Sequence, residues 1–243
     1  MPEDKDNETL ISHLEALRET LLKCFISMGL ILPFAFFIAP KALNMLIKII
    51  IGESSVMLNY FSPIEVFIIQ IKLALVIDFI VCFPYIAKQI WNFLLPALYD
   101  NERKIIKSVV LISSMLFALG VLFCIFIILP WIIKFGVSFS TSNIQAVFGI
   151  SNIITTALWL SVAFGFMFQM PLITYYLIKS GIISYDSVCE KRRYVIVILL
   201  FVAAILTPPD VISQIMLFIP TYCLFEAGLF FARKYNSQDK NNS

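Results

Sequence analysis

Charged residues are scarce in this sequence. Only 14% of its 243 residues are Asp, Glu, Lys or Arg, 60% are hydrophobic, and the mean hydropathy is +0.92. A soluble globular domain is nearer half apolar and a quarter charged. The stretches 108–133 and 135–178 carry no charge and exceed the roughly 20 residues that a helix needs to cross a bilayer. The sequence therefore predicts an all-α integral membrane protein.

Further absences narrow the function. The single histidine, His13, has no serine or cysteine constellation around it, and no GxSxG or HExxH motif occurs. The five cysteines form no CxxC pair, and we interpret them as reduced packing residues. An intramembrane hydrolase needs a nucleophile and base or a metal site, so we expect no enzyme, cofactor or metal. The net charge of +2 gives no indication of nucleic acid binding.

Apolar runs predict six transmembrane spans within one domain, residues 1–243, because no repeat or low-complexity linker divides the chain. The length of the third span predicts a tilt, or a bend near Pro130, and Pro171 interrupts the fourth span. The fifth span has only 13 uncharged residues, roughly 20 Å of helix against a hydrocarbon core of about 30 Å. The expected spans are 21–39, 66–87, 108–131, 150–178, 194–206 and 211–232.

The distribution of Lys and Arg predicts the orientation. Of these 18 residues, 14 fall on the side of the two termini, three on the opposite side, and Lys72 inside the second span. The positive-inside rule then places both termini in the cytoplasm. On the outer side, the sequence 41–51 predicts a separate interfacial helix, and Asp210 is expected to cap the sixth span after Pro208 and Pro209.

Seven motifs follow one another along the chain. They are HLEALRETLL (13–22), SPIEVFIIQIKL (62–73), QIWNFLLPALYDNERK (89–104), AFGFMFQMP (163–171), KRRYVIV (191–197), LTPPDVISQ (206–214) and IPTYCLFEAGLFFAR (219–233). Together they resemble the TatC family, the largest subunit of the twin-arginine protein translocase. The resemblance covers nearly the whole chain. It implies six helices, cytoplasmic termini, and short fifth and sixth helices.

The resemblance also implies a function. TatC binds the twin-arginine signal peptide of folded cargo, recruits single-span TatA-type and TatB-type subunits, and takes part in export driven by the proton-motive force. It implies a signal-peptide contact at Glu102 in the first inner loop. Carboxylates suit this task because a guanidinium group donates planar, multidentate hydrogen bonds. Phe93, Leu95 and Tyr99 in the same loop are expected either to form its packing frame or to contact the apolar part of the signal. The other interpretation of Glu102 is a solvated loop charge.

The chain departs from the family at two positions. Ala16 replaces the usual Glu of the first motif, and Glu15 lies one residue earlier, about 100° around a helix. We expect Glu15, with Glu19 one turn later on the same face, to supply the second carboxylate; a solvated helix face is the alternative. Gln169 stands where the family often has an intramembrane Glu. It predicts either a hydrogen bond to a partner helix or an amide satisfied within this chain.

Other polar groups lie in or beside the spans. An ionised Asp78 near the middle of the second span would be costly, so we expect it to face a polar cavity and partly replace the acid missing at Gln169. Lys72 is six residues from Asp78, about 120° around the helix, so a direct pair is not expected. Glu226 matches the family and either reaches the cytoplasmic interface or lines the path along which cargo is transported. Asp210 either caps the sixth span or lines the outer end of that transport path.

The leading interpretation is therefore a receptor subunit of the twin-arginine translocase in a bacterial inner membrane, with an organellar inner membrane as the alternative location. We expect a homo-oligomer within a receptor complex. The alternative function is a proton-coupled small-solute transporter that uses Asp78, Lys72 and Glu226 as a relay. Such transporters often contain inverted repeats, and this sequence shows none.

Overall fold

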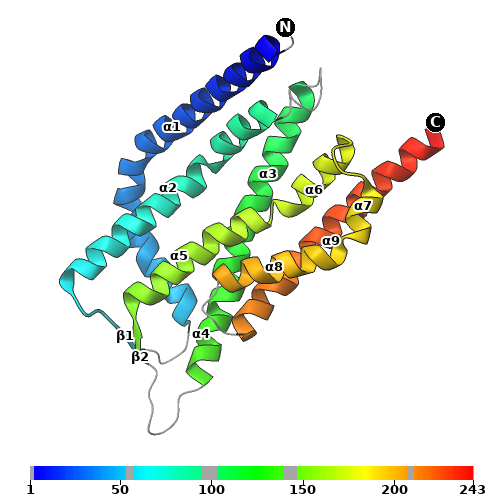
Figure 1. The fold of residues 1–243 in the computed structure, drawn as a ribbon. Coiled ribbons are helices and arrows are strands. Elements are labelled where there is room, and N and C mark those ends of the chain that lie inside the picture. Colours follow the sequence, from blue (N-terminus) through cyan, green and yellow to red (C-terminus); the bar gives the residue numbers. More distant parts are fainter. Residues whose placement is uncertain (1–2, 53–56, 95–102, 139–146, 207–210, 243) are drawn as a thin grey trace.

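The computed structural model of the chain describes residues 3–52, 57–94, 103–138, 147–206 and 211–242. Helices make up nearly all of this part of the chain (Figure 1). In order, the elements are α1 (Glu3–Ile51), β1 (Met57–Asn59), α2 (Pro63–Leu94), α3 (Arg103–Phe123), the π-helical turn η1 (Cys124–Ile128), α4 (Leu129–Ser138), β2 (Val147–Gly149), α5 (Ile150–Met167), α6 (Met170–Lys179), α7 (Tyr185–Glu190), α8 (Arg192–Leu206) and α9 (Val211–Asn242).

Within the described ranges, 5 helical stretches are long and apolar enough to cross a membrane. They contain or overlap the first, second, third, fourth and sixth predicted spans. The predicted fifth span corresponds to α8, whose 15 residues rise about 22 Å, so its expected shortness is confirmed. Helix α9 is longer than expected, with 32 residues, because it continues past its apolar part into a polar segment. The stretches are Leu14–Ile51, Pro63–Phe93, Ile106–Ser138, Ile150–Lys179 and Gln214–Arg233.

The separate outer helix expected over 41–51 is wrong as an element, because this segment is the last part of α1. Pro40 lies inside α1 and removes one backbone hydrogen bond, which bends a helix without having to end it. Figure 1 shows α1 changing direction along its length. Leu43, Leu46 and Ile50 are buried in the core, so one face of the segment packs on the other helices.

The predicted interruption at Pro171 is confirmed, whereas the third span contains a π-helical turn before Pro130 and its tilt or bend stays a prediction. The turn η1 precedes Pro130, and its wide hydrogen-bonding pattern provides room where the proline ring would meet the carbonyl four residues earlier. The fourth stretch breaks into α5 and α6 at Phe168–Gln169, just before Pro171. The break turns the chain within one membrane-length stretch and brings Gln169 to a helix junction.

The sequence did not predict the parallel pairing of β1 with β2. Met57 pairs with Val147, Leu58 with Phe148 and Asn59 with Gly149. The pair joins the α1–α2 and α4–α5 connections. It lies at the opposite end of the molecule from both termini (Figure 1). The described ends of α1 and α9 therefore share one end of the bundle, here called the inner end, and the β pair marks the outer end.

The hydrophobic core lies where the helices contact one another. Aromatic rings join α2, α3 and α5, and the Phe83 and Phe117 rings stack with centroids 3.6 Å apart. Gly165 lets α5 approach this stack, since a Cβ there would lie 2.4 Å from the Phe117 ring. Similarly, a Cβ at Gly228 of α9 would lie 2.7 Å from Pro171 of α6. Both glycines therefore allow a close approach between helices.

Candidate functional site

The inner end carries the carboxylates that the first motif predicted. Glu15 and Glu19 lie one turn apart on α1, and both side chains are exposed. Glu19 forms an ion pair with Lys23 at 2.7 Å, while Glu15 has no ionic partner in the part of the chain that the structure describes. The two predicted carboxylates are therefore in different states: Glu15 is open, and Glu19 already holds a cation.

The first inner loop is only partly described. Leu95, Tyr99 and Glu102 lie outside the described residues, as does Asp210 of the outer turn. Phe93 lies in the last turn of α2 and is half-buried. Nearby, the buried Trp91 contacts Tyr176 of α6, with ring centroids 5.4 Å apart. This contact packs the end of α2 against α6. Trp91 stands in one of the quoted motifs, but no role was predicted for it.

Gln169 is satisfied within the chain. Ser113 Oγ of α3 donates to Gln169 Oε1 at 2.7 Å, and Gln169 Nε2 donates to the Ser113 carbonyl at 3.0 Å. Both residues are buried. Of the two alternatives, the structure therefore supports the internal amide. The adjacent serines at 113 and 114 in an apolar run were the only signal of this partner in the sequence.

Asp78 is nearly inaccessible, with 1% of its surface exposed. Cys82 Sγ, one turn later on α2, donates to Asp78 Oδ1 at 3.5 Å. Cys82 is also close to Ser27 and Cys24 of α1, so this group belongs to the α1–α2 contact. Gln169 belongs to the contact of the α5–α6 junction with α3. The structure thus gives Asp78 and Gln169 different partners on different helices.

Lys72 and Glu65 tie α2 to α5 toward the outer end. Lys72 Nζ donates to Thr155 Oγ1 at 3.1 Å. Glu65 accepts hydrogen bonds from the backbone N–H groups of Phe61 at 2.8 Å and of Ser151 at 3.3 Å. The second bond reaches the first turn of α5, whose own N-cap residue supplies no side-chain bond. Glu65 therefore caps a helix that starts 85 residues later in the sequence.

Glu226 joins α9 to α8 toward the inner end. Tyr222 OH donates to Glu226 Oε1 at 2.9 Å, and Arg192 pairs with Glu226 Oε2 at 3.3 Å. Arg192 and Arg193 stand in the KRRYVIV motif and belong to the positive charge of the terminal side in the six-span arrangement. The structure adds an ion pair for Arg192 and places the Arg193 guanidinium 5.1 Å from the Tyr194 ring centroid.

The proposed relay residues lie in separate groups. Asp78 bonds Cys82, Lys72 bonds Thr155, and Glu226 bonds Tyr222 and Arg192. The Asp78 bond lies within α2, the Lys72 bond joins α2 to α5, and the Glu226 bonds lie on α8 and α9. Within the described ranges, no hydrogen bond or ion pair links two of these groups. This arrangement does not favour the transporter alternative. The described residues also contain no cluster of three His, Cys, Asp or Glu side chains that could hold a metal.

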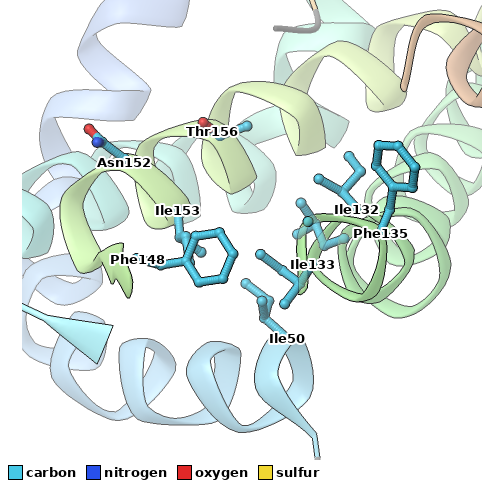
Figure 2. Close-up of a pocket in the computed structure, with 10 residues that line it drawn as sticks. Ile50, Ile132, Ile133, Phe135, Phe148, Asn152, Ile153 and Thr156 are labelled. Carbon is cyan, nitrogen blue, oxygen red and sulfur yellow. The ribbon is translucent and has the colours of Figure 1, made fainter. Parts of the chain in front are cut away.

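A cavity of about 360 Å³ lies near the outer end (Figure 2). Ile50 of α1, Ile132 and Ile133 of α4, and Phe148 of β2 supply apolar walls, while Asn152 lies on the far side, on α5. The lining carries no charge, so it cannot hold a guanidinium group by ion pairing. The exposed carboxylates of α1, Glu15 and Glu19, lie at the inner end instead.

The comparisons with known proteins agree with this architecture. The family described as Sec-independent protein translocase protein (TatC) matches residues 12–220. The TatC protein of Escherichia coli O6:H1 is 34% identical over 242 residues, covering 98% of this chain and 93% of that protein. The Aquifex aeolicus TatC protein is 35% identical over 227 residues, covering 92% and 94%.

Solved structures match as well. A crystal structure of the twin-arginine translocase receptor TatC in DDM superposes with a TM-score of 0.84 at 34% identity, covering 90% of this chain and 99% of that chain. A second crystal structure of this receptor gives a TM-score of 0.83 at 35% identity. The family match, the relatives and the shared helical architecture together show that this chain belongs to the TatC family of Sec-independent protein translocase components.

Proposed function

We propose that this chain is the receptor subunit that binds twin-arginine signal peptides of folded proteins at the inner end of the bundle. The observation that carries the proposal is the exposed Glu15 carboxylate, which has no ionic partner among the described residues of a TatC-family chain. An open carboxylate can accept two parallel hydrogen bonds from a guanidinium group. The solved relatives are themselves described as twin-arginine translocase receptors.

The signal-peptide site would combine α1 with the first inner loop. The α1 carboxylates Glu15 and Glu19 and the loop carboxylate Glu102 would together bind the two arginines. Phe93, Leu95 and Tyr99 would contact the apolar part of the signal or support the loop, and these loop roles follow from the family resemblance alone. The half-buried position of Phe93 beside the α2–α6 aromatic contact is consistent with a supporting role.

The rest of the proposal concerns assembly and transport. Residues 1–243 would form one domain, and several copies of this chain would assemble into a receptor complex in a bacterial inner membrane. Single-span TatA-type and TatB-type subunits would associate with that complex. The proton-motive force would drive export. Partner contacts or the path would involve Lys72, Gln169, Asp210 and Glu226; since Gln169 is bonded to Ser113, a partner helix would have to exchange with that serine.

Asp78 would have a transport role as well. It is a carboxylate with 1% exposure in an apolar span, where ionisable groups are costly and generally functional. Asp78→Asn keeps the shape and hydrogen-bonding capacity but cannot ionise, so we expect slower export of twin-arginine cargo at an unchanged protein level. Export at the wild-type rate would remove Asp78 from the mechanism without affecting the receptor proposal.

Binding of a labelled twin-arginine signal peptide to the full-length protein in nanodiscs tests the receptor proposal. The matched ligand is the same peptide with twin lysine, which we expect to bind less tightly because an ammonium group cannot form the bidentate pair. Glu15→Gln should weaken twin-arginine binding about tenfold, the loss of one charge-assisted pair.

The matched control is Glu190→Gln, which neutralises an exposed carboxylate on α7. Its affinity should stay within twofold of the wild type, since long-range attraction to an exposed charge is screened by salt. Equal affinity for the twin-arginine and twin-lysine peptides, together with normal export of folded cargo after deletion of the gene, would refute the receptor function.

A further inference from the structure

We propose that Lys23 is an internal competitor of the signal peptide: it occupies the Glu19 carboxylate and lowers the affinity of the receptor for twin arginine. This inference rests on the proposed function and adds a regulation of the same site. The ion pair joins Lys23 Nζ and Glu19 Oε1 at 2.7 Å, one helical turn apart on α1. A glutamate four residues before a lysine is the favourable order for such a pair.

The two carboxylates of α1 form one strip with unequal access. Glu15 and Glu19 are four residues apart, which places them about 6 Å apart along the helix axis. Consecutive residues of an extended peptide are about 3.4 Å apart, so two arginine side chains could span that distance. Glu15 is open and Glu19 is closed by Lys23. An arriving signal therefore finds one free carboxylate and one that it has to take from an internal cation.

The Glu19–Lys23 pair is suited to exchange. The Glu19 and Lys23 side chains retain 67% and 48% of their exposure, so water and salt weaken the pair. Lys23 offers Glu19 a point charge, whereas an arginine offers two parallel hydrogen bonds. A guanidinium group can therefore displace the ammonium group. The apparent affinity for the peptide is the intrinsic affinity multiplied by the fraction of molecules in which Glu19 is free, so the ion pair with Lys23 lowers it.

The test measures the affinity of the labelled twin-arginine peptide for four full-length proteins in nanodiscs: wild type, Lys23→Gln, Glu19→Gln and the double variant. Lys23→Gln should tighten binding about two- to threefold, because an exposed pair of this spacing is closed for only part of the time. Glu19→Gln should weaken binding. In the Glu19→Gln background, Lys23→Gln should have no further effect, since its target carboxylate is gone.

Lys88→Gln is the matched control, because it removes one exposed positive charge from the same end of the bundle. The change in affinity caused by Lys88→Gln measures how far the loss of any one positive charge at this end favours a cationic peptide. The gain in affinity from Lys23→Gln should be larger than that change. An equal effect of the two variants, or a full Lys23→Gln gain in the Glu19→Gln background, overturns the competitor role. A wild-type protein that does not distinguish twin arginine from twin lysine refutes the receptor function instead, so the two failures are distinguishable.

Discussion

At the scale of single residues, two polar side chains in the apolar spans bond partners on other helices. Gln169 bonds Ser113 across 56 positions of sequence, and Lys72 bonds Thr155 across 83. Hydrocarbon offers no hydrogen bonds, so each such group has to find its partner within the protein. These pairs fix which helix faces meet, as well as removing the cost of an unsatisfied group.

The Ser113–Gln169 pair gives a stability prediction. Ser113→Ala removes the donor to Gln169 Oε1 and leaves that oxygen buried, which should cost about 1–3 kcal/mol of unfolding free energy. The variant should therefore unfold at a lower temperature in detergent. Ser113→Ala combined with Gln169→Leu should recover part of the loss, because no polar group is then left without a partner.

Ser114→Ala is the control for this series. Ser114 Oγ donates to the Val110 carbonyl within α3, so its loss leaves no interhelical group unpaired. We expect a much smaller change in the unfolding temperature. If Ser113→Ala and Ser114→Ala unfold at the same temperature as the wild type, the pair does not stabilise the α3 contact.

Sequence reasoning could reach only some of these residues. The substitutions at Ala16 and Gln169 were visible in the motifs, and the Glu19–Lys23 spacing is local. The partners Ser113 and Thr155 lie on distant helices whose relative rotation is set by packing, which no local spacing encodes. Asp78 was expected to replace part of the acid missing at Gln169, but the position of a residue along a span does not determine which neighbouring helix its side chain faces.

At the scale of elements, Glu65 connects the start of α2 with the start of α5. Its two oxygens accept from Phe61 and Ser151, and the second bond satisfies a backbone N–H that α5 cannot satisfy itself. Glu65→Ala should destabilise the protein by about 1 kcal/mol, the typical cost of a lost helix cap. Hydrogen exchange of the first-turn amides of α5 should become faster.

Glu15→Ala serves as the comparison for Glu65→Ala. It also removes a carboxylate from a helix, but that carboxylate has no described partner, so neither stability nor α5 exchange should change. Unchanged exchange in Glu65→Ala would show that the Ser151 amide finds another acceptor and that the cap is dispensable.

The elements differed in how predictable they were. Long apolar runs fixed the existence of the helices, and Pro171 fixed the α5–α6 break, because both signals are local. The separate helix expected over 41–51 was wrong, because a proline such as Pro40 can either bend or end a helix and only the packing of Leu43 and Ile50 on the core decides. The three-residue strands β1 and β2 are too short for an alternating pattern, and their pairing is non-local.

At the scale of the whole molecule, geometry and charge agree on an inner end. Both described chain ends lie at one end of the bundle (Figure 1), and 14 of the 18 Lys and Arg residues belong to that side in the six-span arrangement. The orientation of the C-terminus depends on α8, whose 15 residues are short for crossing a bilayer of ordinary thickness. A short span can be accommodated where the bilayer thins around the protein.

The crossing of α8 decides the location of the C-terminus. If α8 crosses, α7 and the C-terminus both lie in the cytoplasm; if it does not, α9 carries the C-terminus to the opposite side. We expect a C-terminal green fluorescent protein fusion to fluoresce and a C-terminal alkaline phosphatase fusion to be inactive, since the first folds in the cytoplasm and the second needs an oxidising compartment for its disulfides.

Single cysteines supply the internal reference for these fusions, in a background in which all five native cysteines are replaced. Asn59→Cys, at the exposed last residue of β1, should react with a membrane-impermeant maleimide in cells whose outer membrane is opened, and Ser184→Cys, exposed before α7, only after the inner membrane is broken. An active phosphatase fusion with this same labelling pattern would show that α8 stays on the inner side. The predicted location of both termini in the cytoplasm would then be wrong even though the first four spans were placed correctly.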